Sequence, residues 1–268
     1  MTDSVLLEGM TRISLEAGKV ISDIYQTNFG VDTKADGSAV TQADKLAEAL
    51  ILKGLAELAP DMPVLAEEAA SEGNIPVLGN QFFLVDPLDG TREFVNRTGE
   101  FTVNIALIRD GRPVMGVVYA PGCDKLYSGS QDTGAWLRIV APGQNMSEAG
   151  PAKEISARRV DTDNLIAVAS RSHRSPETEE LLTALGAKDF TPAGSSLKFC
   201  LVAEGIADVY PRLGRTMEWD TGAGQAVLEA AGGLVNALDG TDEAGPLTYG
   251  KVAREFDNPH FIAWGKRA

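Results

Sequence analysis

The spacing of apolar residues in the first half of the chain predicts two helices followed by a run of strands. Apolar positions at helical spacing over residues 5–24 predict a core-packing helix; the alternative, a membrane-surface helix, is disfavoured by the mixed flanking charges. A second amphipathic pattern predicts a helix that begins near Asp44. We expect an antiparallel sheet beneath these helices, including a hairpin around 109–113, with strands at 64–66, 82–85, 101–108, 114–119, 125–128 and 135–140.

The pattern changes after residues 141–152, a segment rich in Pro, Gly and polar residues that is the best candidate boundary. We therefore expect an α/β protein in two parts, an α+β part over residues 1–145 and an α/β part over residues 146–268. In the second part, the pattern predicts strands at 165–169, 207–210, 234–237 and 261–264, and helices at 177–185, 195–204 and around 226–230.

The stretch FFLVDPLDGT places two carboxylates at the end of a buried apolar run. Pro87 cannot continue a strand ladder, so we expect Asp86 at the strand's exit and a tight turn at Asp89 and Gly90. Two carboxylates three residues apart suit hard cations, and the amides of Gly90 and Thr91 suit a phosphate beside them. Asp-Pro and Asp-Gly are also common turn dipeptides that need no metal, so this stretch alone leaves both interpretations open.

Other acidic residues also lie at the edges of apolar elements. Glu67 and Glu68 follow an apolar run, where paired carboxylates are usually solvated surface but also suit a magnesium site. Taken by itself, Asp44 at a helix start is explained as a charge that complements the helix dipole, and Asp220 as an N-cap. Acids at the edges of several elements can nevertheless converge on one cleft.

Composition narrows the class of partner. A 268-residue chain with a formal net charge of −14 repels nucleic acids and anionic membranes, so extended polyanion binding is not expected. Two cysteines, Cys123 and Cys200, without metal-ligand spacing argue against a disulfide framework or a zinc site. No signal peptide or long apolar run is present, so we expect a cytoplasmic protein without a membrane span; peripheral association at the inner membrane and the oligomeric state stay open.

Together these motifs resemble those of the magnesium-dependent, lithium-sensitive phosphatases of the inositol monophosphatase superfamily. The resemblance covers nearly the whole chain and rests on an acidic pair, an Asp-Pro-hydrophobic-Asp-Gly-Thr motif and a distal Trp-Asp motif, which here are Glu67 and Glu68, 86–91 and 219–224. It implies a layered α+β sandwich of alternating αβαβα layers. Ala69 and Gly222 depart from the usual pattern, but neither replaces a side chain assigned to metal binding or chemistry.

Within this superfamily the chain is most similar to the 3′(2′),5′-bisphosphate nucleotidases of the bacterial CysQ type. Thr91 is followed by Arg92, Glu93 and Phe94, where inositol phosphatases usually have Thr-Asn-Phe. The segments GEFTVNIAL, SRSH and SSLKFC also resemble the nucleotidase branch. The implied activity is hydrolysis of the 3′-phosphate of 3′-phosphoadenosine 5′-phosphate (PAP) to AMP and phosphate, as part of sulfur assimilation.

The resemblance assigns the metal ligands. It makes Glu67, Asp86 and the Leu88 carbonyl ligands of one Mg²⁺, and places Asp86, Asp89 and Asp220 around a second, with two or three ions in all. Two metals suit in-line displacement at phosphorus because they stabilise both the entering and the leaving oxygen. The main metal-binding loop then belongs to residues 1–145, and the last metal ligand to residues 146–268.

The resemblance also assigns the catalytic and substrate-binding residues. Thr91 and Asp44 would form a proton-relaying dyad beside Glu67, so that water attacks phosphorus directly. The implied substrate-binding set, in which basic groups suit the second phosphate, is Gly90, Thr91, His173, Ser195, Lys198, Arg212 and Asp220. Without the resemblance, His173 is equally well a polar loop residue, and Lys198 and Arg212 solvated charges.

Two other functions stay open at this point. One is a phosphatase of the same fold that acts on inositol or another sugar phosphate, and the other is a non-catalytic nucleotide-binding sensor. An intact Thr91 and Asp44 pair argues against the sensor, because binding alone needs no water-activating dyad.

Overall fold

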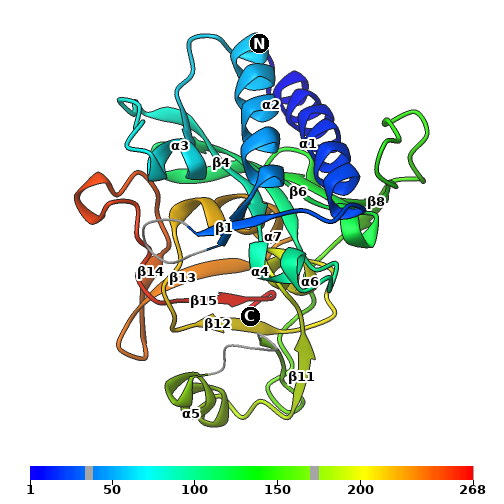
Figure 1. The fold of residues 1–268 in the computed structure, drawn as a ribbon. Coiled ribbons are helices and arrows are strands. Elements are labelled where there is room, and N and C mark those ends of the chain that lie inside the picture. Colours follow the sequence, from blue (N-terminus) through cyan, green and yellow to red (C-terminus); the bar gives the residue numbers. More distant parts are fainter. Residues whose placement is uncertain (34–38, 170–174, 268) are drawn as a thin grey trace.

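The computed structural model describes residues 1–33, 39–169 and 175–267. Helices and sheets alternate in layers from one end of the molecule to the other (Figure 1). The helices α1 and α2 cover the outer face of a first sheet, α6 and α7 lie between the first sheet and a second, and α5 packs beyond the second sheet. This order confirms the predicted αβαβα sandwich.

The helices begin close to where the apolar pattern predicts them. The side chain of Thr2 caps α1 by accepting a hydrogen bond from the N–H of Val5, and Thr41 caps α2 in the same way. Short 3₁₀ turns occur at Pro121–Cys123, Glu218–Asp220 and Val252–Arg254. The helices are α1 (Asp3–Tyr25), α2 (Gln42–Leu58), α3 (Glu67–Ser71), α4 (Thr91–Val95), α5 (Pro176–Ala184), α6 (Leu197–Ala203) and α7 (Gly222–Ala230).

The first sheet has seven strands in sequence order, β3-β4-β5-β6-β7-β8-β9. All neighbours in it are antiparallel except the parallel pair β3 and β4, so the predicted hairpin (β5 and β6) and the predicted antiparallel first half are confirmed. A separate ribbon pairs β1 (Val31–Thr33) with β2 (Ala39–Thr41). The strands of the sheet are β3 (Val64–Ala66), β4 (Gln81–Asp89), β5 (Thr102–Arg109), β6 (Arg112–Ala120), β7 (Lys125–Ser130), β8 (Gly134–Ile139) and β9 (Lys153–Ile155).

The second sheet is mixed and has six strands in the order β11-β10-β12-β15-β13-β14. Its parallel pairs involve β10, and the C-terminal strand β15 inserts between β12 and β13. The short strands β9, β11 and β14 are not among the predicted elements. The strands are β10 (Ile166–Ala169), β11 (Asp189–Pro192), β12 (Val209–Arg212), β13 (Leu234–Asp239), β14 (Asp242–Pro246) and β15 (Phe261–Trp264).

Strand β4 contributes to two hydrophobic cores because its side chains alternate between the faces of the first sheet. Phe83 and Val85 pack into the core beneath α1 and α2. Phe82 and Leu84 pack into the core between the sheets, where α7 approaches closely. A Cβ at Gly116 of β6 would collide with the backbone of α7, so glycine is required there. Phe82, Leu84 and the other residues on their face of β4 therefore point towards the layer of helices between the two sheets.

The predicted division at residue 145 stays a prediction. Strand β9 lies after that point in the sequence and yet pairs with β8 in the first sheet. The core between the sheets takes side chains from both parts of the chain. Within the described residues, no helix is both long enough and apolar enough to cross a membrane.

Candidate active site

The two aspartates of β4 lie at an irregularity in the strand. Asp86 pairs with Asn104 and Asp89 with Thr102. A step of three residues along β4 therefore matches a step of two residues along β5. Strand β4 continues to Asp89, and the expectation that it ends at Asp86 is wrong: Pro87 is accommodated at a bulge rather than ending the pairing. Within the bulge the N–H of Leu88 donates to Asp86 Oδ1 at 3.0 Å. Both aspartates thus stay on the ladder, at its end.

Gly90 connects β4 directly to α4. Its φ of 90° lies in the left-handed region, and an added Cβ would lie 3.2 Å from the Glu100 carbonyl oxygen and 3.2 Å from Ser195 Cβ. Only glycine fits both the conformation and the space. The turn brings Thr91, the first residue of α4, back beside the aspartates.

The Thr91 hydroxyl is within hydrogen-bonding distance of the Asp44 carboxylate. Thr91 Oγ1 lies 3.1 Å from Asp44 Oδ1 and 3.3 Å from the Leu88 carbonyl oxygen. The other carboxylate oxygen of Asp44 accepts hydrogen bonds from the N–H and the hydroxyl of Thr41, each at 2.7 Å. Asp44 therefore stabilises the start of α2, as its helix-start interpretation requires, and also contacts Thr91. Burial raises the pKa of Asp44, and the bonds from Thr41 partly offset this.

The acidic pair at the start of α3 is not solvated surface. Glu68 is buried and Glu67 is partly buried. Strand β3 runs parallel to β4, with Ala66 opposite Val85, so Glu67 follows at the same level as Asp86. The carboxyl group of Glu67 lies close enough to Asp86 to raise the pKa of Asp86.

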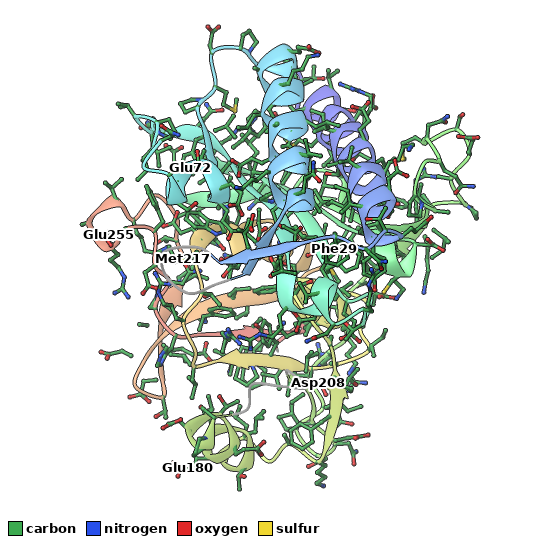
Figure 2. All side chains as sticks on the ribbon, in the orientation of Figure 1. Phe29, Glu72, Glu180, Asp208, Met217 and Glu255 are labelled. Carbon is green, nitrogen blue, oxygen red and sulfur yellow. The ribbon has the colours of Figure 1, made fainter. Side chains whose placement is uncertain are left out.

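Asp220 reaches the same region from the second part of the chain. It ends the 3₁₀ turn before α7, and its Oδ2 accepts a hydrogen bond from the N–H of Met217 at 2.8 Å. The N-cap residue of α7 is Thr221, so Asp220 is not the cap that its position in the sequence suggests. Met217, which is labelled in Figure 2, directly precedes this turn and lies at the level of the middle layer of helices. The turn packs against β4 and β5.

Burial and mutual repulsion dominate the electrostatics of these acids. Burial, then repulsion from Glu67, Asp89 and Asp220, raises the pKa of Asp86 well above its ordinary value. Burial, then repulsion from Asp89 and Glu67, does the same for Asp220. Burial raises the pKa of Asp89 to about 6, against the attraction of the nearby Lys198 cation. Carboxylates whose pKa values rise for these reasons gain from a cation placed among them.

The donor set suits a hard divalent cation. In the described part of the chain, no group of three or more His, Cys, Asp or Glu side chains is arranged to hold a metal ion. Burial and repulsion from Glu67, Asp89 and Asp220 instead raise the pKa of Asp86, and a cation among these carboxylates would relieve that repulsion. Carboxylate and carbonyl oxygens, without His or Cys, are the ligands that Mg²⁺ prefers. The types of donor present therefore suit the implied metal, although the described carboxylates are not gathered into a ready-made metal cluster in this structure.

Two basic side chains lie next to the acids. Lys198 on α6 is buried, and its pKa is lowered by burial, while Asp89 and Asp220 oppose the shift. Its Nζ lies 5.6 Å from the ring centre of Tyr210. The positive charge of Arg212 at the end of β12 acts on both Lys198 and Asp220. Neither cation is the freely solvated charge that its residue type alone suggests.

Among the described residues, Arg212 Nε is buried without a hydrogen-bond acceptor. To the described part of the chain, Arg212 donates through a terminal nitrogen, to the Arg215 carbonyl oxygen at 3.2 Å. A buried guanidinium N–H without an acceptor is costly in the free protein, so it suits an anionic ligand. The structure thus brings together the predicted residues Asp44, Glu67, Asp86, Leu88, Asp89, Gly90, Thr91, Ser195, Lys198, Arg212 and Asp220, while His173 lies outside the described residues.

A buried chain of polar groups connects β5 to the turn before α7, and its members Thr102, Asn104 and Ser196 are absent from the predicted set. Thr102 Oγ1 donates to Asn104 Oδ1 at 3.0 Å and lies 3.1 Å from Ser195 Oγ. Asn104 Nδ2 donates to Ser196 Oγ at 2.9 Å, and Ser196 Oγ donates to the Asp220 carbonyl oxygen at 2.9 Å. The signal in the sequence is a pair of alternating polar residues, Thr102 and Asn104, inside an otherwise apolar strand. The chain ties the backbone of Asp220 to the strand beside Asp86.

A cavity of about 970 Å³ lies elsewhere in the molecule. It is bounded by one face of α1, by β7 and β8, and by residues 143–147. None of the acids at the end of β4 lines it, so this cavity is separate from the candidate site.

Comparisons with known proteins find relatives that cover almost the whole chain. The family model described as the inositol monophosphatase family matches residues 3–261. The chain is 44% identical to the 3′(2′),5′-bisphosphate nucleotidase CysQ of Escherichia coli over 96% of this chain and 98% of that protein. It resembles the crystal structure of CysQ from Bacteroides thetaiotaomicron, with a TM-score of 0.79, 39% identity and coverage of 98% and 97% of the two chains. The inositol monophosphatase from Anabaena matches with a TM-score of 0.74 and 26% identity over 98% and 91% of the chains.

Proposed function

Because the chain belongs to the inositol monophosphatase family, and its near-full-length relatives are bisphosphate nucleotidases, we infer that it is a 3′(2′),5′-bisphosphate nucleotidase. It hydrolyses the 3′-phosphate of PAP to give AMP and phosphate. Inositol phosphatases share the fold as more distant relatives, which makes sugar-phosphate hydrolysis the weaker alternative. Phosphatases of this family are in general metal-dependent, and we propose two or three Mg²⁺ ions for this protein.

The observation that carries the function is the contact between Thr91 and Asp44 beside the buried acids. A hydroxyl held 3.1 Å from a carboxylate can pass a proton to it and accept one from a water molecule. Divalent metal bound by Glu67, Asp86, the Leu88 carbonyl, Asp89 and Asp220 would supply a water of lowered pKa and neutralise phosphate charge. A nucleotide sensor would need only the binding groups, so the dyad favours an enzyme.

The protein's own residues orient the reaction. Asp44 is fixed by Thr41, so its free carboxylate oxygen faces Thr91 in a defined direction. The N–H groups of Gly90 and Thr91 begin α4 and are placed to receive the phosphate that is cleaved. We propose that the cleaved phosphate lies there and that the nucleotide extends towards Lys198 and Arg212, which receive the other phosphate. His173 belongs to the same proposed substrate-binding set.

Product identification tests the reaction. Purified protein is incubated with PAP and Mg²⁺, and the products are separated by chromatography. The proposal requires 5′-AMP and phosphate in equal amounts. Formation of 3′-AMP would show that the other phosphate is cleaved, and would reverse the proposed orientation of the nucleotide.

Arg212→Ala is expected to lower kcat/KM for PAP about 10- to 100-fold, mainly by raising KM. The substitution removes both the positive charge of Arg212 and its hydrogen bond to the second phosphate of PAP. Hydrolysis of a nucleotide with a single 3′-phosphate should change much less, since it lacks the second phosphate. Arg215→Ala is the matched control: Arg215 is an exposed neighbour whose Nε bonds Asp257 at 3.0 Å. Equal losses for both nucleotides, or in both variants, would contradict the assignment of Arg212.

Lithium is expected to inhibit the enzyme at concentrations where potassium does not. Li⁺ resembles Mg²⁺ in size but carries half its charge. Bound among Asp86, Asp89 and Asp220, it would retain the product and would not support the next catalytic cycle. We expect uncompetitive or mixed inhibition in initial-rate kinetics on PAP. LiCl and KCl are compared at equal ionic strength to separate site occupancy from screening. Identical inhibition by the two salts would contradict this prediction.

A further inference from the structure

Helix α2 carries two buried carboxylates one turn apart, and the mechanism above uses only the first. Asp44 contacts Thr91, whereas Glu48, which is 5% exposed, faces the start of α3. Glu48 Oε2 accepts a hydrogen bond from the N–H of Glu68 at 2.7 Å, and Oε1 accepts one from the N–H of Ala69 at 2.7 Å. Both oxygens of one buried carboxylate therefore hold two successive backbone amides.

These amides directly follow Glu67, whose backbone is thus fixed on both sides. On the N-terminal side, β3 pairs with β4 in register as far as Ala66 and Val85. On the C-terminal side, Glu48 holds the next two N–H groups. The distance between β3 and α2 then decides where the Glu67 carboxylate lies relative to Asp86. A shift of the backbone after Ala66 would move the Glu67 carboxylate away from Asp86.

We propose that Glu48 is a positioning residue for the metal site, which holds Glu67 in place for the cation. The proposal rests on the proposed function, because it assigns Glu67 as a metal ligand. Groups that orient a metal ligand without touching the metal typically change metal affinity or activity 10- to 100-fold when they are removed. Helix α2 then serves the site twice: Asp44 orients the proton-relaying hydroxyl of Thr91, and Glu48 orients the metal ligand Glu67.

Both carboxylate oxygens of Glu48 and the full length of its side chain are needed to hold the two amides. Gln at this position would offer a single acceptor oxygen, and its NH₂ group would face one of the two backbone N–H groups. One amide would lose its partner and the start of α3 would move. Asp would keep the charge but would be one methylene too short to reach both amides at 2.7 Å.

The test is the Mg²⁺ affinity of Glu48→Gln and Glu48→Asp, measured without substrate by titration calorimetry and by the rise in unfolding temperature with MgCl₂. Glu48→Gln is expected to weaken Mg²⁺ binding about 10-fold or more, and to raise the Mg²⁺ concentration for half-maximal activity by the same factor. At saturating Mg²⁺, kcat should change little, because the contact between Thr91 and Asp44 remains. Glu48→Asp should lie between Glu48→Gln and the wild type, and it decides the question if Glu48→Gln does not fold.

Asp208→Asn provides a matched control. Asp208 is also fully buried and accepts hydrogen bonds from backbone amides, including that of Ile166 at 2.7 Å. Figure 2 places it in the layer of the second sheet, away from Glu72 at the end of α3. This variant should lose thermal stability and keep its Mg²⁺ affinity.

Two outcomes are distinguished by this design. Glu48 variants that lose thermal stability like Asp208→Asn, with unchanged Mg²⁺ affinity, would overturn the inference and make Glu48 a purely structural group. A wild-type protein that releases no phosphate from any bisphosphate nucleotide would overturn the proposed function instead. In that case the calorimetric measurement would still decide the role of Glu48, because it needs no turnover.

Discussion

Asp86→Asn is expected to abolish Mg²⁺-dependent turnover while the protein stays folded. Asparagine keeps the oxygen that accepts the N–H of Leu88, so the bulge of β4 can persist. The variant loses the negative charge that faces Glu67, Asp89 and Asp220, and with it the proposed bridging ligand between two metals. Initial rates with PAP across a range of MgCl₂ concentrations, with circular dichroism as a check on folding, measure this effect.

The same substitution should preserve or raise the unfolding temperature in EDTA. Burial and neighbouring carboxylates raise the pKa of Asp86, so without metal the folded protein must either protonate this group or bury its charge among like charges. Asparagine removes that cost. Asp208→Asn, the buried control paired with Arg158, should instead be destabilised and remain active. Near-normal activity of Asp86→Asn at saturating Mg²⁺ would contradict the two-metal assignment.

Thr91→Ala is expected to slow the chemical step by about 10²- to 10⁴-fold, because a positioned proton-transfer group contributes about that much. Mg²⁺ binding measured by calorimetry should change little, since the proposed ligands are other groups. Thr91→Ser keeps the hydroxyl beside Asp44 and is expected to recover most of the rate. Single-turnover kinetics on PAP report the chemical step directly.

Thr11→Ala is the control for loss of a buried hydroxyl. Thr11 Oγ1 donates to the Leu7 carbonyl oxygen at 2.7 Å within α1, and this variant should keep normal kinetics. The relay assignment would be wrong if Thr91→Ser were as slow as Thr91→Ala. Thr91 would be a structural group if Mg²⁺ binding were lost in step with activity.

Elements with a strong local pattern are where the sequence is most informative. The apolar stripe of α1 and the hairpin of β5 and β6 are found as predicted. Strand β4 is longer than predicted because a bulge can accommodate Pro87, and the pattern of residue types does not distinguish a bulge from a strand end. The short strands β9 and β11 depend on pairing partners that are distant in the sequence, and no local signal specifies them. Strand β14 instead pairs with β13 across a tight turn that contains Asp239 and Gly240, a local hairpin signal that the prediction missed.

Residues of the candidate site likewise differ in how clearly the sequence indicates them. Motif residues such as Asp86 and Thr91 could be identified because their type and spacing carry chemistry. Glu48 could not, because its role depends on the packing of α2 against α3 across 20 positions of sequence. For Asp44 the sequence offered a helix-start role and a catalytic role as alternatives, and the structure shows a contact with Thr41 at the helix start and a contact with Thr91, so the two roles do not exclude each other.

The measurement that tests the central claim most directly is kcat/KM for PAP and for inositol 1-phosphate, with Mg²⁺ and with EDTA. The account predicts Mg²⁺-dependent phosphate release that favours PAP by about 100-fold or more, because Lys198 and Arg212 would bind a second phosphate that the inositol ester lacks. Equal or higher kcat/KM for inositol 1-phosphate, or undiminished release of phosphate from PAP in EDTA, would contradict it.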